Sequence, residues 1–146
     1  MSRVPASVLF VCSENALRSP MAEGMVKALF GDHVYVDSVG VRDGELDPMA
    51  SVVMQEIDID ISGHRPKRLD DLLDTSFDAI VALSAEAHQE ALDRMRNEAV
   101  DVVFWPISDP SVVDGNRDVR LAAYREVRDR LRVLIEEMFG ESHDAP

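Results

Sequence analysis

The chain has 146 residues, enough for one domain whose core needs no disulfide or metal to hold it together. Its formal net charge of −13 excludes the basic surface that nucleic acid or an anionic membrane would require. A single cysteine excludes an internal disulfide and a cysteine-cluster metal site, and no apolar run is long enough to span a membrane. Because the N-terminus also lacks a signal-peptide pattern, we expect a cytoplasmic protein.

Strand-like and helix-like segments alternate along the chain. Strands are predicted where short β-branched or apolar runs occur, at residues 7–12, 33–38, 77–83 and 101–105. Helices are predicted where apolar residues recur at helical spacing, at residues 20–30, 47–57, 84–96 and 119–139. Asp47 and Ser84 are suitable N-caps for the second and third of these helices. A short helical piece at 69–73 and a loop at 106–118 complete the pattern.

This alternation predicts an α/β fold, a single doubly wound domain with a four-stranded parallel sheet flanked by helices on both faces. The domain is expected to span residues 1–140, followed by a flexible tail at 141–146. In such sheets ligands bind beyond the carboxyl ends of the strands. Cys12, Ser38 and the loop after Trp105 all fall at that edge.

The segment that joins the first strand to the first helix contains a potential nucleophile, Cys12, and a cation, Arg18. Cys12 ends the strand, and the backbone N–H groups that follow can curl around an anion at the positive end of the helix. Such surroundings favour the thiolate form of a cysteine, and Arg18 can bind two oxygens of an anion with its planar fork. Taken alone, Cys12 would be a small buried side chain at a strand end. The strand, the arginine, Ser19 and the helix together favour an oxyanion site.

Residues 12–20 resemble the Cys-x5-Arg-Ser-Pro signature of the low-molecular-weight protein-tyrosine phosphatases. The resemblance extends to the chain length, to Ser38 and Gly40 after the second strand, and to Asp109 with its following proline. It implies the fold of that family and hydrolysis of protein phosphotyrosine or similar aryl phosphates, with neither metal nor cofactor. The expected partner is a phosphorylated protein or a small aryl phosphate, and the oligomeric state stays open.

The resemblance also implies roles for individual residues. Cys12 would attack phosphorus and form a phosphocysteine, and Asp109 would protonate the leaving oxygen and then activate water. Asp109 could equally be an ordinary turn residue before proline, with Asp114 and Asp118 as rivals for the acid role. The phosphate would be bound by loop residues Ser13, Glu14, Asn15, Ala16, Leu17 and Arg18. Three further residues would support the loop, Ser19 at the sulfur and Ser38 and His64 by bracing Asn15. On its own, His64 could be an unrelated loop histidine.

Three features depart from the pattern of that family. Many members have glycine where Glu14 stands, and this carboxylate would tend to repel a dianion. Many also have a second cysteine where Leu17 stands, so this chain cannot protect Cys12 with an internal disulfide. Residues 41–49 and 111–113 lack the aromatic side chains that wall a phosphotyrosine pocket. The substrate of the predicted site therefore stays open.

The nearest alternative is a single-cysteine arsenate reductase, since arsenate is isosteric with phosphate. Thioredoxin-linked members of that branch relay oxidation through extra cysteines, so this chain would need an external low-molecular-weight thiol. A non-catalytic phosphoprotein-binding module is a third interpretation, but such a relative should have lost Cys12, Arg18 or Asp109, and all three are present. A receiver domain would need an aspartate near Ser84, and a flavodoxin would need a hydroxyl-rich loop after the first strand.

Overall fold

The computed structural model describes residues 4–42, 44–72 and 76–140, so the predicted tail at 141–146 lies outside the described residues. Within these residues, four parallel strands form one sheet in the order β2-β1-β3-β4. The strands are β1 (Ser7–Cys12), β2 (Tyr35–Gly40), β3 (Ala79–Ala82) and β4 (Asp101–Phe104). The helices are α1 (Arg18–Phe30), α2 (Pro48–Gln55), α3 (Ala85–Arg94) and α4 (Arg117–Phe139). Two short 3₁₀ turns cover Leu69–Asp71 and Pro110–Val112.

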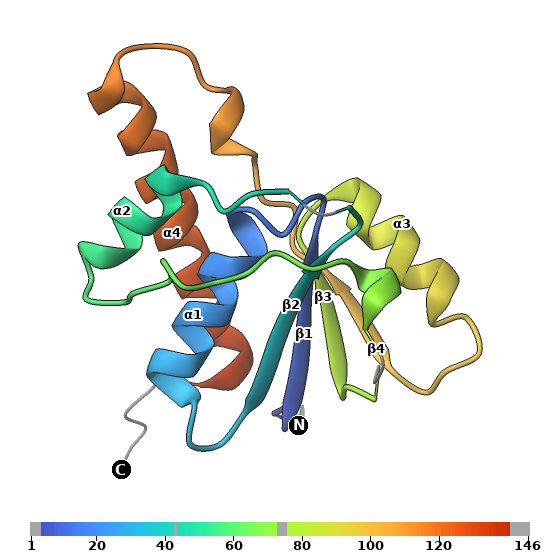
Figure 1. Ribbon diagram of the computed structural model, residues 1–146. Helices are drawn as coiled ribbons and strands as arrows, with labels where there is room; N and C mark the ends of the chain where they lie inside the picture. Colours follow the sequence, from blue (N-terminus) through green and yellow to red (C-terminus); the bar gives the residue numbers. More distant parts are fainter. Residues whose placement is uncertain (1–3, 43, 73–75, 141–146) are drawn as a thin grey trace.

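Helices cover both faces of the sheet, with α1, α2 and α4 on one side and α3 on the other (Figure 1). The central strand β1 shows why: Val8 and Phe10 pack toward α1 and α4, while Leu9 and Val11 pack toward α3. A strand with apolar residues on both faces is typical of a buried parallel sheet. The predicted fold class is confirmed.

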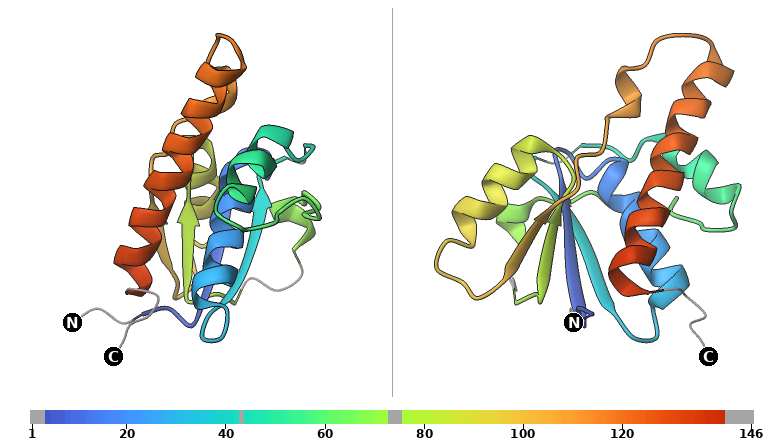
Figure 2. Two further views of the ribbon diagram at one scale, coloured as in Figure 1. Left: turned by 90° about the vertical axis from the view of Figure 1, so that its left-hand side faces the viewer. Right: turned by 180° about the vertical axis from the view of Figure 1, so that it is seen from behind.

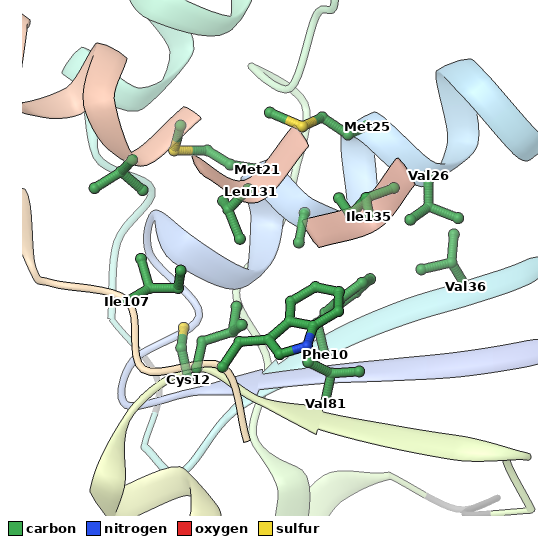
Figure 3. Close-up of a cluster of buried hydrophobic side chains, with 14 of the residues drawn as sticks. Phe10, Cys12, Met21, Met25, Val26, Val36, Val81, Ile107, Leu131 and Ile135 are labelled. Carbon is green, nitrogen blue, oxygen red and sulfur yellow. The ribbon is translucent and has the colours of Figure 1, made fainter. Parts of the chain in front are cut away.

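The larger core lies between the sheet and the pair α1 and α4 (Figure 3). Phe10 contacts Trp105 in this core, with the ring centroids 6.0 Å apart. Cys12 and Ile107 lie at the end of the same cluster (Figure 3). The carboxyl end of β1 is therefore held by the packed interior. Among the described residues, no helix is both long and apolar enough to cross a membrane.

The bounds of several elements differ from the prediction, and β2 and α1 show the physical reasons. Strand β2 begins at Tyr35 because the N–H groups of His33 and Val34 still bond to the carbonyl oxygen of Phe30 at the end of α1. It runs on to Gly40, which pairs with Cys12. Helix α1 begins two residues before the predicted start, since Met21 N–H already bonds to Leu17 O at 3.0 Å.

The predicted loop 106–118 is also interrupted. Asp109 caps the 3₁₀ turn Pro110–Val112, and Asn116 caps α4 by accepting a hydrogen bond from Val119 N–H at 2.9 Å. Helix α4 therefore begins at Arg117. Together with the loop before it, the first part of α4 extends past the carboxyl ends of the strands (Figure 2). Asp109 consequently lies at the same edge of the sheet as Cys12, beyond the carboxyl ends of the strands.

Candidate active site

The backbone of residues 12–18, which we call the anion loop, wraps around the sulfur of Cys12. The Cys12 side chain is buried, and its Sγ receives the Asn15 backbone N–H at 3.2 Å and lies 2.9 Å from Ser19 Oγ. Asn15 has a positive φ of 56°, a conformation that asparagine tolerates better than most residues. This conformation directs the backbone N–H of Asn15 toward Cys12 Sγ. N–H donors in that position can stabilise a sulfur anion or an oxyanion bound next to the sulfur.

The side chain of Asn15 is fully buried, and all of its hydrogen-bonding groups have partners. Its Nδ2 donates to Ser19 Oγ at 2.8 Å and to Ser38 Oγ at 3.0 Å. Its Oδ1 accepts the Lys67 backbone N–H at 3.0 Å and lies 2.9 Å from His64 Nε2. Because Oδ1 can only accept, His64 carries its proton on Nε2. The structure thus brings the predicted supporting residues Ser19, Ser38 and His64 onto one side chain.

Sequence reasoning missed Glu23, which extends this network behind the anion loop. Ser38 Oγ–H donates to Glu23 Oε1 at 2.5 Å, and Lys27 Nζ lies 2.6 Å from Glu23 Oε2. His64 Nδ1 is 3.8 Å from the same carboxylate. Burial lowers the pKa of His64, which favours the neutral ring. In the sequence, Glu23 and Lys27 are one helical turn apart and look like an ordinary surface ion pair. Only the structure shows that Glu23 is buried and accepts a hydrogen bond from Ser38.

Arg18 joins the anion loop to the loop that carries Asp109. One guanidinium N–H donates to the Ile107 carbonyl oxygen at 2.9 Å. The first turn of α1 fixes the backbone of Arg18, and Ile107, which is buried in the core, fixes the position of its guanidinium. Among the described residues, the guanidinium makes no other hydrogen bond, so its remaining N–H donors, of five in all, can bind an anion.

A cavity of about 420 Å³ opens above the anion loop. Its lining includes Cys12, Arg18 and Asp109, and the rival acids Asp114 and Asp118 are not among its described lining residues. Asp109 Oδ1 accepts the Ser111 backbone N–H at 2.9 Å and Ser111 Oγ–H at 2.6 Å. The three residues predicted to be catalytic therefore face one cavity, while their roles stay predictions.

The rim of the cavity carries the predicted loop residue Glu14. Its exposed carboxylate lies 3.9 Å from the Arg42 guanidinium, which also binds Glu86 of α3 at 2.5 Å. Arg42 thus offsets part of the negative charge at the rim. The apolar lining includes Leu46 and Pro48, and none of the described lining residues is aromatic.

Asp47 and Tyr124 connect helix α4 to the anion loop through hydrogen bonds. Sequence reasoning did not predict this connection. Tyr124 O–H donates to Asp47 Oδ2 at 2.5 Å, and Asp47 backbone N–H bonds to Ala16 O at 2.9 Å. Burial, with the neighbouring Asp47 carboxylate, raises the pKa of the Tyr124 phenol, so it stays a donor. Helix α4 therefore helps to hold the loop that faces the cavity.

A parallel sheet with a cysteine and an arginine in an anion-binding loop is typical of cysteine-dependent enzymes that act on tetrahedral oxyanions. Residues 7–143 match the family described as low molecular weight phosphotyrosine protein phosphatase. The chain belongs to this family, whose cysteine-dependent enzymes include phosphatases and arsenate reductases.

Similar proteins carry both kinds of name. The arsenate reductase of Halalkalibacterium halodurans is 33% identical over 124 residues, which is 85% of this chain and 88% of that protein. A solved arsenate reductase in the oxidized state has a TM-score of 0.77 at 26% identity, covering 92% of this chain and 96% of that one. The low molecular weight protein tyrosine phosphatase from T. tengcongensis has a TM-score of 0.69 at 29% identity, covering 90% and 98%.

Proposed function

We propose that the chain is a single-cysteine arsenate reductase that depends on an external low-molecular-weight thiol. The observation that carries this proposal is a cavity lined by Cys12 and Arg18 in which no described lining residue is aromatic. Arsenate needs the anion loop but no wall for a flat leaving group. The name of a relative that is 33% identical supports the proposal. The proposal assigns the chain to the cytoplasm, a reducing compartment rich in free thiols.

The proposed reaction takes place in three steps. Cys12 Sγ attacks arsenic, an As–O bond breaks, and the departing hydroxide leaves as water with a proton from Asp109. Arg18 and the amides of the anion loop stabilise the negative charge. An external thiol then attacks Sγ, and the S–As bond breaks with its electron pair remaining on arsenic, which becomes arsenite. A second thiol reduces the resulting mixed disulfide, so two thiols are oxidised for each arsenate.

Hydrolysis of a phosphomonoester through a phosphocysteine is the second candidate function. It is favoured by Asp109, a carboxyl group on the same cavity as Cys12, because a general acid suits a leaving phenolate. Protein phosphotyrosine or similar aryl phosphates would be the substrate class. Leu46 and Pro48 would then provide the apolar contact for the ring.

A side-by-side assay separates the two functions. Arsenate turnover is followed as NADPH oxidation with glutathione, glutaredoxin and glutathione reductase, together with direct detection of arsenite. Hydrolysis of p-nitrophenyl phosphate is measured with a chelator present. We expect thiol-dependent arsenite formation to exceed phosphate release under matched conditions. Phosphate release without any arsenite would overturn the proposal in favour of the second candidate.

The Cys12→Ser variant is expected to lose both activities, because a serine oxygen cannot form the disulfide and is a poor nucleophile here. Arg18→Lys keeps the positive charge but loses the two-pronged contact, and we expect a loss of roughly 10²-fold. Ser62→Ala, on an exposed turn, is the control and should keep full activity. Activity retained by Cys12→Ser would remove the nucleophile from both mechanisms.

A further inference from the structure

The two oxygens of the Asp109 carboxyl group lie in different surroundings. Oδ1 accepts two hydrogen bonds, both from Ser111, at 2.9 Å from the backbone nitrogen and 2.6 Å from Oγ. Among the described residues, Oδ2 has no hydrogen-bond partner. Asp109 and Ser111 both line the catalytic cavity. The side chain of Ser111 therefore contacts only one of the two carboxyl oxygens.

We propose that Ser111 is a positioning residue for Asp109, holding Oδ1 so that Oδ2 is the oxygen that gives and takes the proton. This inference rests on the acid–base role of Asp109 in the proposed function. An oxygen that accepts two hydrogen bonds has both lone pairs engaged, so the carboxyl proton belongs on the other oxygen. The terminal torsion of aspartate is otherwise broad, and a carboxyl group that rotates freely spends little time aimed at the leaving group.

The first proton transfer is the same for both candidate substrates. As Sγ bonds to arsenic or phosphorus, the Oδ2–H bond breaks and its proton leaves with hydroxide as water or with phenolate as phenol. In hydrolysis of a phosphocysteine, water then gives its proton back to Oδ2 as the S–P bond breaks. In arsenate reduction, the external thiol gives its S–H proton to Oδ2 as its sulfur attacks Sγ and the S–As bond breaks. Ser111 forms no bond to substrate in either step.

The same arrangement occurs away from the site and supplies a matched control. Ser62 donates to Asp60 Oδ1 from its backbone nitrogen at 2.8 Å and from Oγ at 2.6 Å. Neither Asp60 nor Ser62 lines the catalytic cavity. The Asp-x-Ser turn is therefore a stable local structure in its own right, and its position on the cavity is what makes Ser111 relevant to proton transfer. Ser62→Ala removes the same hydrogen bond without touching the site.

The first test compares aryl phosphates that differ in the need for a proton. The leaving group of phenyl phosphate is phenolate, whose conjugate acid has a pKa of about 10, like that of tyrosine. The leaving group of 2,4-dinitrophenyl phosphate is a far weaker base. Ser111→Ala should lower kcat/KM about tenfold for phenyl phosphate and less than twofold for the activated ester, in line with the loss of one hydrogen bond. Ser62→Ala should change neither, and Ser111→Thr should restore most of the loss. An equal loss on both esters would overturn the positioning role.

The second test is a double-mutant cycle with Asp109→Asn, measured on phenyl phosphate and on thiol-coupled arsenate turnover. Ser111→Ala should have no further effect once Asp109 is replaced, because it acts only through that carboxyl group. A further loss in the Asp109→Asn background would refute the proposal. If Asp109→Asn slows turnover but Ser111→Ala does not, only the positioning role fails. If Asp109→Asn has no effect in either assay, the acid–base role fails as well.

Discussion

Gly40 shows how closely two backbones approach beneath the anion loop. A Cβ atom at this position would lie 2.6 Å from the Asn15 nitrogen, the Glu14 carbonyl carbon and the Arg42 carbonyl oxygen. Real Cβ atoms essentially never come that close to backbone, so an added methyl group must displace the loop. The glycine is required by space and not by an unusual φ.

We expect Gly40→Ala to weaken oxyanion binding and turnover by about 10²-fold, since a shift of the order of 1 Å in a catalytic loop has that effect. The stability loss should be about 1–3 kcal/mol, as for overpacked interiors. Phosphate binding by calorimetry and urea denaturation measure the two effects. Gly63→Ala is the matched control, because nothing lies within 4 Å of its added methyl group. A Gly40→Ala variant with unchanged phosphate affinity would contradict this account.

Residues predictable from the chain's own pattern have contacts close by in sequence. Ser38 and His64, whose contacts with Asn15 span 23 and 49 residues, were predicted only through the family resemblance. The anion loop and the caps Asp47 and Ser84 were predictable because their partners are neighbours in sequence. Glu23 and Tyr124 were not, because Glu23 meets Ser38 15 residues away and Tyr124 meets Asp47 77 residues away. The start of α1 was missed for another reason, since Leu17 makes no side-chain cap that a pattern could reveal.

Helices α2 and α4 are joined by an ion-pair network around Glu56, just after α2. Arg125 and Arg128 both bind its carboxylate, with N–O distances of 2.8 Å. The hydrogen bond from Arg125, followed by that from Arg128, lowers the pKa of Glu56 from its ordinary 4.5 to about 2. The carboxylate is about one third exposed, so its net effect on stability is about 1 kcal/mol at most.

A folded-state pKa below the unfolded value gives stability that is present above about pH 4.5 and is lost as the pH falls toward 2. Glu56→Gln should therefore lower the melting temperature at pH 7, and the difference from the unmodified chain should shrink steadily from pH 5 to pH 2. Thermal denaturation followed by circular dichroism measures this. The control is Glu98→Gln, since no described residue forms an ion pair with Glu98. A difference that grew as the pH fell would have the wrong sign.

The whole molecule carries a large excess of negative charge, −13 at pH 7, so its surface charges repel one another in the folded state. At physiological ionic strength, salt largely screens the repulsion between charges that lie more than about 8 Å apart. We expect the melting temperature at pH 7 to rise between 20 and about 300 mM NaCl. Near pH 4.5, the isoelectric point, the same salt series should have little effect. A fall in melting temperature with salt at pH 7 would mean that ion pairs outweigh the repulsion.

Trp105 is the only tryptophan in the chain, and it stands where β4 gives way to the loop that carries Asp109. Its indole packs on Phe10, two residues before Cys12, and Ile107, two residues after Trp105, accepts the hydrogen bond of Arg18. We expect a movement of Arg18 toward a bound anion to change the surroundings of this one fluorophore. Intrinsic emission therefore offers a label-free signal of site occupancy, readable in stopped-flow mixing with phosphate or arsenate before any bond is broken.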